Sequence, residues 1–195
     1  MTIKECLAGF KPLSIHARFA IGLRIFERYI RVRGLEDESI WTFLADMWQF
    51  PLLSDVAEKL EWEKQRGELA DFGLGDEIPE ELEEELYTLA ISEDYFGLWV
   101  SQVTELAWTN LLQGPQDEES MEFIRTLLRL SIVSNIGVPE LHLYQTHLFT
   151  DNEGWGNPLT QEELESWQAN PCTIQLTSEE DISLHYSEQS AELSL

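Results

Sequence analysis

Residues 93–113 read EDYFGLWVSQVTELAWTNLLQ, and they carry one charge in their interior, Glu105. Their apolar side chains recur at helical spacing and cover more than one side of the helix that they predict. Gly114 and Pro115 follow at once and end the pattern. A helix that is apolar all round belongs inside a protein, so we place this one at the centre of a helical bundle.

Five further segments show apolar residues at helical spacing, with recognisable starts and stops. Together with residues 93–113 they predict a mainly α protein with about six main helices. A loop that contains Gly73 and Gly75 is expected between the third helix and the fourth. The five segments are 14–33, closed by Gly34; 39 to the residue before Pro51; 54–67, with Asp55 and Glu58 spaced as a capping-box-like pair; the Pro79 helix with Leu82, Leu86 and Leu89; and 117–135, closed by Gly137 and Pro139.

The last third of the chain is less regular. Residues 139–149 indicate a short helix, 151–158 a turn-rich loop, and Thr160 with Glu163 a capping box that starts a helix through about Gln168. Over 173–187 apolar residues alternate with a period of two, which favours a small β-hairpin; a mobile acidic tail or a short helix started by Ser178 explains the same residues equally well. We therefore expect a bundle core over 1–136 and an irregular extension over 137–195, packed as one domain.

Charge is distributed unevenly along the chain. The 195 residues hold 12 Lys and Arg against 37 Asp and Glu, which gives a net charge of −25. Residues 1–33 alone carry +5, which leaves −30 for the other 162. Residues 67–124 contain sixteen acids and no Lys or Arg. Like charges at helical spacing repel one another, so a sequence that keeps them gives up stability for a negative field.

Composition excludes several classes of partner. A chain this acidic has no electrostatic reason to bind nucleic acid phosphates or anionic membrane surfaces. Its uncharged runs are too short to span a bilayer. Cys6 and Cys172 lie far apart in the sequence, which indicates two free, buried thiols rather than a disulfide framework. We expect a soluble protein of the cytoplasm.

The basic residues gather near the N-terminus. Arg24, Arg28 and Arg31 lie along one side of the predicted helix 14–33. The interpretation that we favour pairs them with acids on neighbouring helices, and the alternative is an anion site.

No catalytic or cofactor motif is present in the sequence, whether a phosphate-binding loop, a zinc motif or a nucleophile elbow. The nearest match is residues 151–162, which fit the EF-hand calcium loop at its first, sixth and twelfth positions. Trp155 stands at the fifth position and offers no oxygen, so a capped turn before the Thr160 helix is the better interpretation. We predict no catalytic residue, no metal site and no cofactor.

Two resemblances add to this reading. The succession of Phe19 to Tyr29, Gly34, Ile40 and Trp48, within residues 14–50, resembles the opening of the YjaG-like helical proteins of bacteria, a family without an assigned activity. That resemblance implies an all-helical fold and no mechanism. In type, a small and very acidic chain without motifs resembles the immunity proteins of bacterial polymorphic and contact-dependent toxins, which bind and block a cognate toxin, often a basic nuclease. No residue carries over from that class.

The leading hypothesis is a non-enzymatic protein that neutralises a basic partner, a toxin or nuclease domain, by covering its Lys and Arg with an acidic surface. A DNA-mimic inhibitor of a nucleic-acid-binding protein, a carboxylate-based metal-binding protein or enzyme, and an ordinary acidic scaffold remain alternatives. The residues that we expect to bind the partner belong to the Pro79 helix and the loop before it. They are Asp71, Asp76, Glu77, Glu80, Glu81, Glu84 and Glu85.

Overall fold

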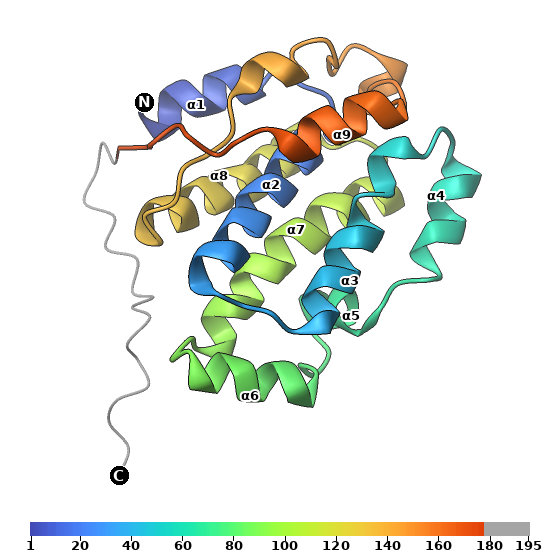
Figure 1. The fold of residues 1–195 in the computed structure, drawn as a ribbon. Helices are drawn as coiled ribbons and strands as arrows, with labels where there is room; N and C mark the ends of the chain where they lie inside the picture. Colours follow the sequence, from blue (N-terminus) through green and yellow to red (C-terminus); the bar gives the residue numbers. More distant parts are fainter. Residues whose placement is uncertain (178–195) are drawn as a thin grey trace.

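The computed structural model describes residues 1–177 (Figure 1). Within this range the chain forms nine α-helices and no β-sheet, which confirms the prediction of a mainly α fold. None of the helices described is both long and apolar enough to cross a membrane. The helices are α1 (Ile3–Phe10), α2 (Ile15–Arg33), α3 (Glu38–Met47), α4 (Val56–Glu63), α5 (Glu68–Gly73), α6 (Glu80–Thr88), α7 (Glu93–Gln113), α8 (Asp117–Val133) and α9 (Gln161–Ala169).

The predicted central helix, α7, packs against α2, α5 and α8 in the middle of the molecule (Figure 1). The Trp99 ring is fully buried and stacks on Tyr29 of α2, with ring centroids 4.4 Å apart. α2 and α8 approach closely at Gly22, where a Cβ would lie 3.1 Å from Leu127 Cδ1. Close packing of this kind excludes water from three helices at once, and it makes α2, α7 and α8 the rigid centre of the fold.

A buried arginine ties the start of α8 to the corner between α1 and α2. The Arg18 guanidinium donates to Asp117 Oδ1 at 2.6 Å, to Ser120 Oγ at 2.6 Å and to the Lys11 carbonyl oxygen at 2.7 Å. Burial lowers the pKa of Arg18, and the hydrogen bond that the Asp117 carboxylate accepts from Arg18 opposes that shift. The charge is tolerated inside the protein because a carboxylate and several oxygens surround it.

The sequence prediction missed α1. Thr2 caps this helix: its side chain accepts a hydrogen bond from the Glu5 backbone N–H, and the Glu5 carboxylate accepts one from the Thr2 N–H at 2.8 Å. Cys6 and Phe10 then bury their side chains, and α1 packs on α8. The capping-box spacing at Thr2 and Glu5 is the signal that would have revealed the helix.

The predicted helix 54–67 and the loop after it are also corrected. Asp55 is the N-cap as expected, but α4 ends at Glu63, where turns replace the helical hydrogen bonds. A separate helix, α5, then occupies the segment assigned to the loop, and it packs closely on α7. Gly73 is the last residue of that helix. A glycine is required there because a Cβ would lie 2.5 Å from Thr104 Oγ1 of α7. The glycine marks a close approach between helices rather than a loop.

Residues 137–177 pack along α2 and α1. The predicted capping box of Thr160 and Glu163 is present and starts α9. The helix expected over 139–149 is reduced to a 3₁₀ turn, Leu141–Tyr144. Ile174 pairs with Val138 in an antiparallel bridge and Thr177 pairs with Thr2 in a parallel one, so the first arm of the expected hairpin joins other segments. Its second arm, 178–187, lies outside the described residues.

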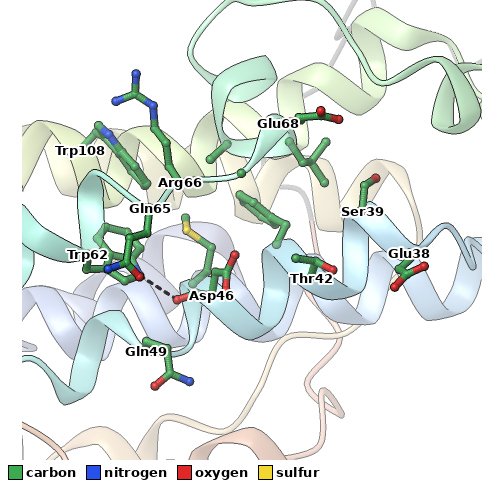
Figure 2. Close-up of a pocket in the computed structure, with 15 residues that line it drawn as sticks. Glu38, Ser39, Thr42, Asp46, Gln49, Trp62, Gln65, Arg66, Glu68 and Trp108 are labelled. Atoms are coloured by element: carbon green, nitrogen blue, oxygen red, sulfur yellow. Dashed lines mark hydrogen bonds between the residues drawn. The ribbon is translucent and has the colours of Figure 1, made fainter.

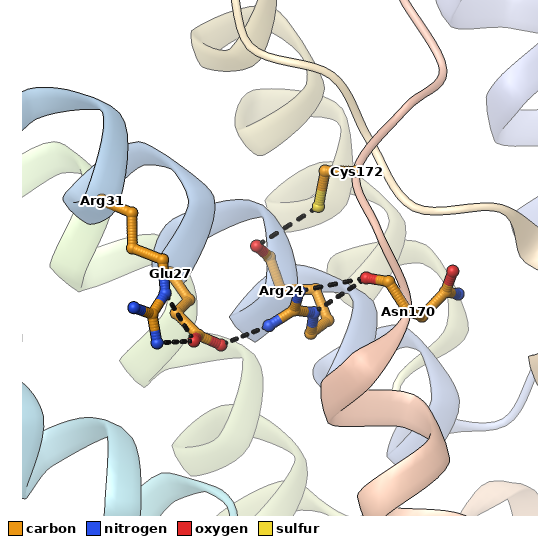
Figure 3. A network of polar contacts seen from close by, with 5 residues as sticks. All are labelled: Arg24, Glu27, Arg31, Asn170 and Cys172. Atoms are coloured by element: carbon orange, nitrogen blue, oxygen red, sulfur yellow. Dashed lines mark hydrogen bonds and ion pairs between the residues drawn. The ribbon is translucent and has the colours of Figure 1, made fainter.

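The predicted partners of the basic side chains on α2 are wrong. Arg24 and Arg31 share one carboxylate, Glu27, which lies on α2 itself rather than on a neighbouring helix (Figure 3). Arg24 also donates to the Asn170 carbonyl oxygen at 3.0 Å, which fixes the end of α9 on α2. Arg28 is exposed beside them. Spacings of three and four residues allow these pairs within one helix, and they satisfy Arg24 and Arg31 locally.

Both cysteines are free, as expected. Cys6 is buried as predicted, whereas Cys172, which was expected to be buried, is only half-buried. Burial raises the pKa of Cys6 to about 12 and that of Cys172 to about 11, so both remain protonated thiols.

Candidate partner-binding surface

The helix α6 presents carboxylates and one aromatic side chain to solvent. Leu82 and Leu86 bury its inner side against the protein. The opposite side carries four exposed carboxylates and Tyr87, whose side chain is 88% exposed. Tyr87 lies one turn after Glu83 and Glu84, so its ring stands among negative charges. We call this outward side the α6 ridge; it consists of Glu80, Glu81, Glu83, Glu84 and Tyr87.

The structure separates the seven predicted residues into two groups. Asp76, Glu77, Glu80, Glu81 and Glu84 are exposed, and they follow one another along the turn before α6 and along α6 itself. The other two, Asp71 and Glu85, make contacts within the protein. Which of the seven contact a partner stays a prediction.

Asp71 and Glu85 make internal contacts that the sequence did not reveal. Asp71 forms an ion pair with Arg66, the last cation before the acidic stretch. Glu85 accepts backbone hydrogen bonds from Glu36 at 2.8 Å and from Asp37 at 3.0 Å, and it thereby joins α6 to the residues that start α3. These two carboxylates hold the surface together rather than standing free on it.

The acidic surface continues from the α6 ridge over the neighbouring loop. A shallow depression there is lined by Glu68, Asp71, Asp76 and Glu77. Glu68 also borders a deeper cleft of about 380 Å³ between α3 and the connection from α4 to α5. The ridge, the depression and the cleft therefore adjoin one another.

Aromatic and carboxylate side chains line the cleft together (Figure 2). Trp62, Trp108, Phe43 and Met47 supply apolar surface. Glu38, Asp46 and Glu68 supply the negative charge. Burial raises the pKa of Asp46. The sequence did not identify this site, because its two sides come from segments about twenty residues apart and only their packing brings them together.

The remaining candidates for chemistry have structural explanations. The Asp151 backbone oxygen accepts from the Gly154 and Gly156 N–H groups, each at 3.1 Å, which makes the calcium-like segment a capped turn. Trp155 is buried in contact with Phe50 and His16. Within residues 1–177 no three His, Cys, Asp or Glu side chains are placed to hold a metal ion together. The arrangement on the α6 side can attract, orient and bind cationic groups.

We compared the chain with family models, with curated proteins and with solved structures, and none of them matches it. The resemblance to the YjaG-like proteins and the resemblance in type to toxin immunity proteins stay predictions. What the chain binds has to be inferred from its own surface.

Proposed function

We propose that this protein is a non-enzymatic binding protein that neutralises a basic partner through the α6 ridge, and most concretely that it is an immunity protein for a toxin with a basic nuclease domain. The observation that carries the proposal is Tyr87, an aromatic side chain 88% exposed among four exposed glutamates. Like charges at helical spacing destabilise a helix that faces only water, and tyrosine is enriched among the residues that carry the binding energy of protein interfaces.

The two parts of the ridge have different roles in binding. The glutamates draw a basic partner toward the surface and orient it, which raises the rate of encounter and disfavours acidic competitors. The exposed Tyr87 becomes buried against the partner and supplies an aromatic contact of the kind from which interfaces take much of their affinity. Once bound, the protein covers the Lys and Arg side chains with which a nuclease holds phosphate, and so prevents the nucleic acid from binding.

Other features support the proposal. α6 rests on the core through Leu82 and Leu86 and is joined to α3 by Glu85, so the ridge is held in place before a partner arrives. The free thiols of Cys6 and Cys172 fit a reducing compartment, and we propose that the protein acts in the cytoplasm.

Capture of partners by the tagged full chain tests the proposal. The quadruple variant Glu80→Lys, Glu81→Lys, Glu83→Lys and Glu84→Lys reverses the ridge and leaves Glu85 in place. A control variant, Glu118→Lys, Glu119→Lys, Glu162→Lys and Glu165→Lys, makes the same change in net charge at exposed positions of α8 and α9. Both variants are compared with the unmodified chain in extracts of the cell of origin, over a series of salt concentrations.

We expect the unmodified chain and the control to retain a basic protein that salt releases, and the ridge variant to lose it. The single variant Tyr87→Ala should weaken retention of the basic protein about tenfold or more. Equal retention by the ridge variant and the control would contradict the proposal. Retention of a chromosomal nucleic-acid-binding protein in place of a toxin would favour the DNA-mimic alternative.

A further inference from the structure

The cleft between α3 and the α4–α5 connection is a separate site next to the α6 ridge. Its volume of about 380 Å³ lies at the small end of the range for ligand pockets, roughly 300–1,000 Å³. Its floor is apolar, and carboxylates from both of its sides border it (Figure 2). A site of this size suits one long side chain better than a whole helix.

Asp46 is the half-buried carboxylate of the cleft. Its backbone oxygen accepts a hydrogen bond from Trp62 Nε1 at 2.9 Å, which fixes the two sides of the cleft relative to each other. Burial raises the pKa of the Asp46 carboxyl, and among the described residues no donor or cation opposes that shift. A carboxylate that is partly shielded from water and has no donor beside it is poorly stabilised, so a ligand that supplies N–H groups and positive charge gains binding free energy there.

Two indole rings form the apolar side of the same cleft. Trp62 and Trp108 lie with their ring centroids 4.8 Å apart. Trp108 is only 4% exposed, and its Nε1 has no hydrogen-bond partner among the described residues. Aromatic faces beside a carboxylate attract planar cations, because the ring face and the carboxylate both carry negative potential.

The resident cation of this region does not fill the cleft. Arg66 lies at the rim, where its guanidinium is paired with Glu63 and Asp71. Figure 2 shows that guanidinium turned away from α3 and Asp46. Glu38 and Glu68 therefore add to the negative potential around Asp46, which opposes an anionic ligand.

We propose that this cleft accepts an arginine side chain of a basic partner. The alkyl part of the arginine lies against Met47, and the guanidinium stacks on the Trp62 ring and donates to the Asp46 carboxylate. Arginine fits better than lysine because its planar group stacks on indole rings and donates two parallel hydrogen bonds to one carboxylate. The source of the arginine rests on the proposed function above, whereas the chemistry of the cleft does not.

A short peptide tests the chemistry of the cleft directly. The probe is acetyl-Gly-Arg-Gly-amide, and its control is the same peptide with citrulline, which has nearly the same shape and no charge. Binding to the ¹⁵N-labelled full chain is followed by the indole N–H signals of Trp62 and Trp108 in NMR spectra. Trp62→Phe and Trp108→Phe variants assign those two signals.

We expect the arginine peptide to shift both indole signals in a saturable manner, the lysine analogue to bind more weakly and the citrulline peptide to leave them unchanged. Asp46→Asn should weaken binding of the arginine peptide about tenfold or more, since it removes the charge and one acceptor. Glu68→Gln, at an exposed position, should weaken peptide binding to a smaller extent. It provides a second test of the cleft if the Asp46→Asn variant does not fold. Glu118→Gln on α8 is the matched control and keeps full binding. Equal shifts with arginine and citrulline, or unchanged binding by both cleft variants, would overturn the proposal.

Two variants separate this inference from the proposed function. The ridge variant should still bind the arginine peptide, because no residue that it changes lines the cleft. Asp46→Asn should weaken retention of the basic partner although the ridge is intact. Loss of the partner by the ridge variant together with no peptide binding would refute the cleft site and leave the proposed function standing. Peptide binding without capture of any basic partner would refute the proposed function and leave the cleft site standing.

Discussion

His16 provides a prediction whose magnitude follows from the structure. Its ring lies in the first turn of α2, fully buried, and contacts Phe50 and Trp155 at centroid distances of 5.7 and 5.9 Å. Lys59 is also buried there, with its ammonium 4.7 Å from the Trp155 ring centroid. Burial, together with the charge of Lys59, lowers the pKa of His16 to about 3. The ring is therefore neutral in the folded protein at pH values well above 3.

In the unfolded chain His16 binds a proton that it does not bind in the folded protein. An unfolded histidine has a pKa of about 6.5, so the contribution of neutral His16 to stability is complete above pH 6.5 and is lost as the pH falls toward 3. Each pH unit in that interval lowers the free energy of unfolding by about 1.4 kcal/mol. Between pH 7 and pH 5 the loss from His16 amounts to about 2 kcal/mol, a large part of the stability of an ordinary domain.

Urea unfolding of the full chain at pH 7, 6 and 5 measures this loss. His16→Leu and His16→Gln remove the titrating ring, so their free energy of unfolding should fall less than that of the unmodified protein, by about 2 kcal/mol over the interval. Lys59, His147 and Glu163, which lie around or next to His16, are present in all of these proteins and cancel in the difference. Phe96→Leu, in the core where Phe96 contacts Phe26 and Phe72, is the control and should keep the full pH dependence. Parallel pH curves for the unmodified protein and both His16 variants would refute the reasoning.

Three further predictions concern the acidic region; urea unfolding tests the first two and thermal unfolding tests the third. Ala90→Gly should raise the free energy of unfolding by about 1 kcal/mol, because Ala90, two residues after the end of α6, has φ 54°, where a Cβ is strained; an unchanged value would show that the strain is absent. Glu85→Ala should lower it by about 1–2 kcal/mol, since the Glu36 and Asp37 amides lose their acceptor, whereas Glu84→Ala should change it little. The melting temperature should rise as the salt concentration goes from about 0.01 M to about 0.15 M, as screening relieves repulsion among the acids; a falling melting temperature would show that the acids are mainly paired.

The long helices could be predicted because each combines an apolar pattern with clear end signals. Ser14 and Gly34 mark both ends of α2, and Gly114 with Pro115 separates α7 from α8. The helices that were missed or misplaced are short. α1 spans eight residues and α5 spans six, which is too short for a helical period to be recognised. Gly73, a residue typical of loops, also favoured a loop over a helix at α5.

The candidate site was predictable only in part. The helical spacing of Leu82 and Leu86 fixes the inner side of α6, and the exposure of Tyr87 then follows from geometry. The contact of Glu85 with the Glu36 and Asp37 amides joins segments almost fifty residues apart, and no local pattern indicates it. The same holds for the cleft, which exists only because α3 packs beside the connection from α4 to α5.

The anchoring of α6 has a consequence for how this protein can evolve. Leu82, Leu86 and Glu85 attach the helix, whereas the side chains of the ridge are exposed to solvent. Exchanges at exposed ridge positions therefore change the free energy of unfolding by only a few tenths of a kcal/mol. The outward sequence of α6 can therefore change during evolution while the scaffold stays intact, which under the proposed function is a route to new basic partners.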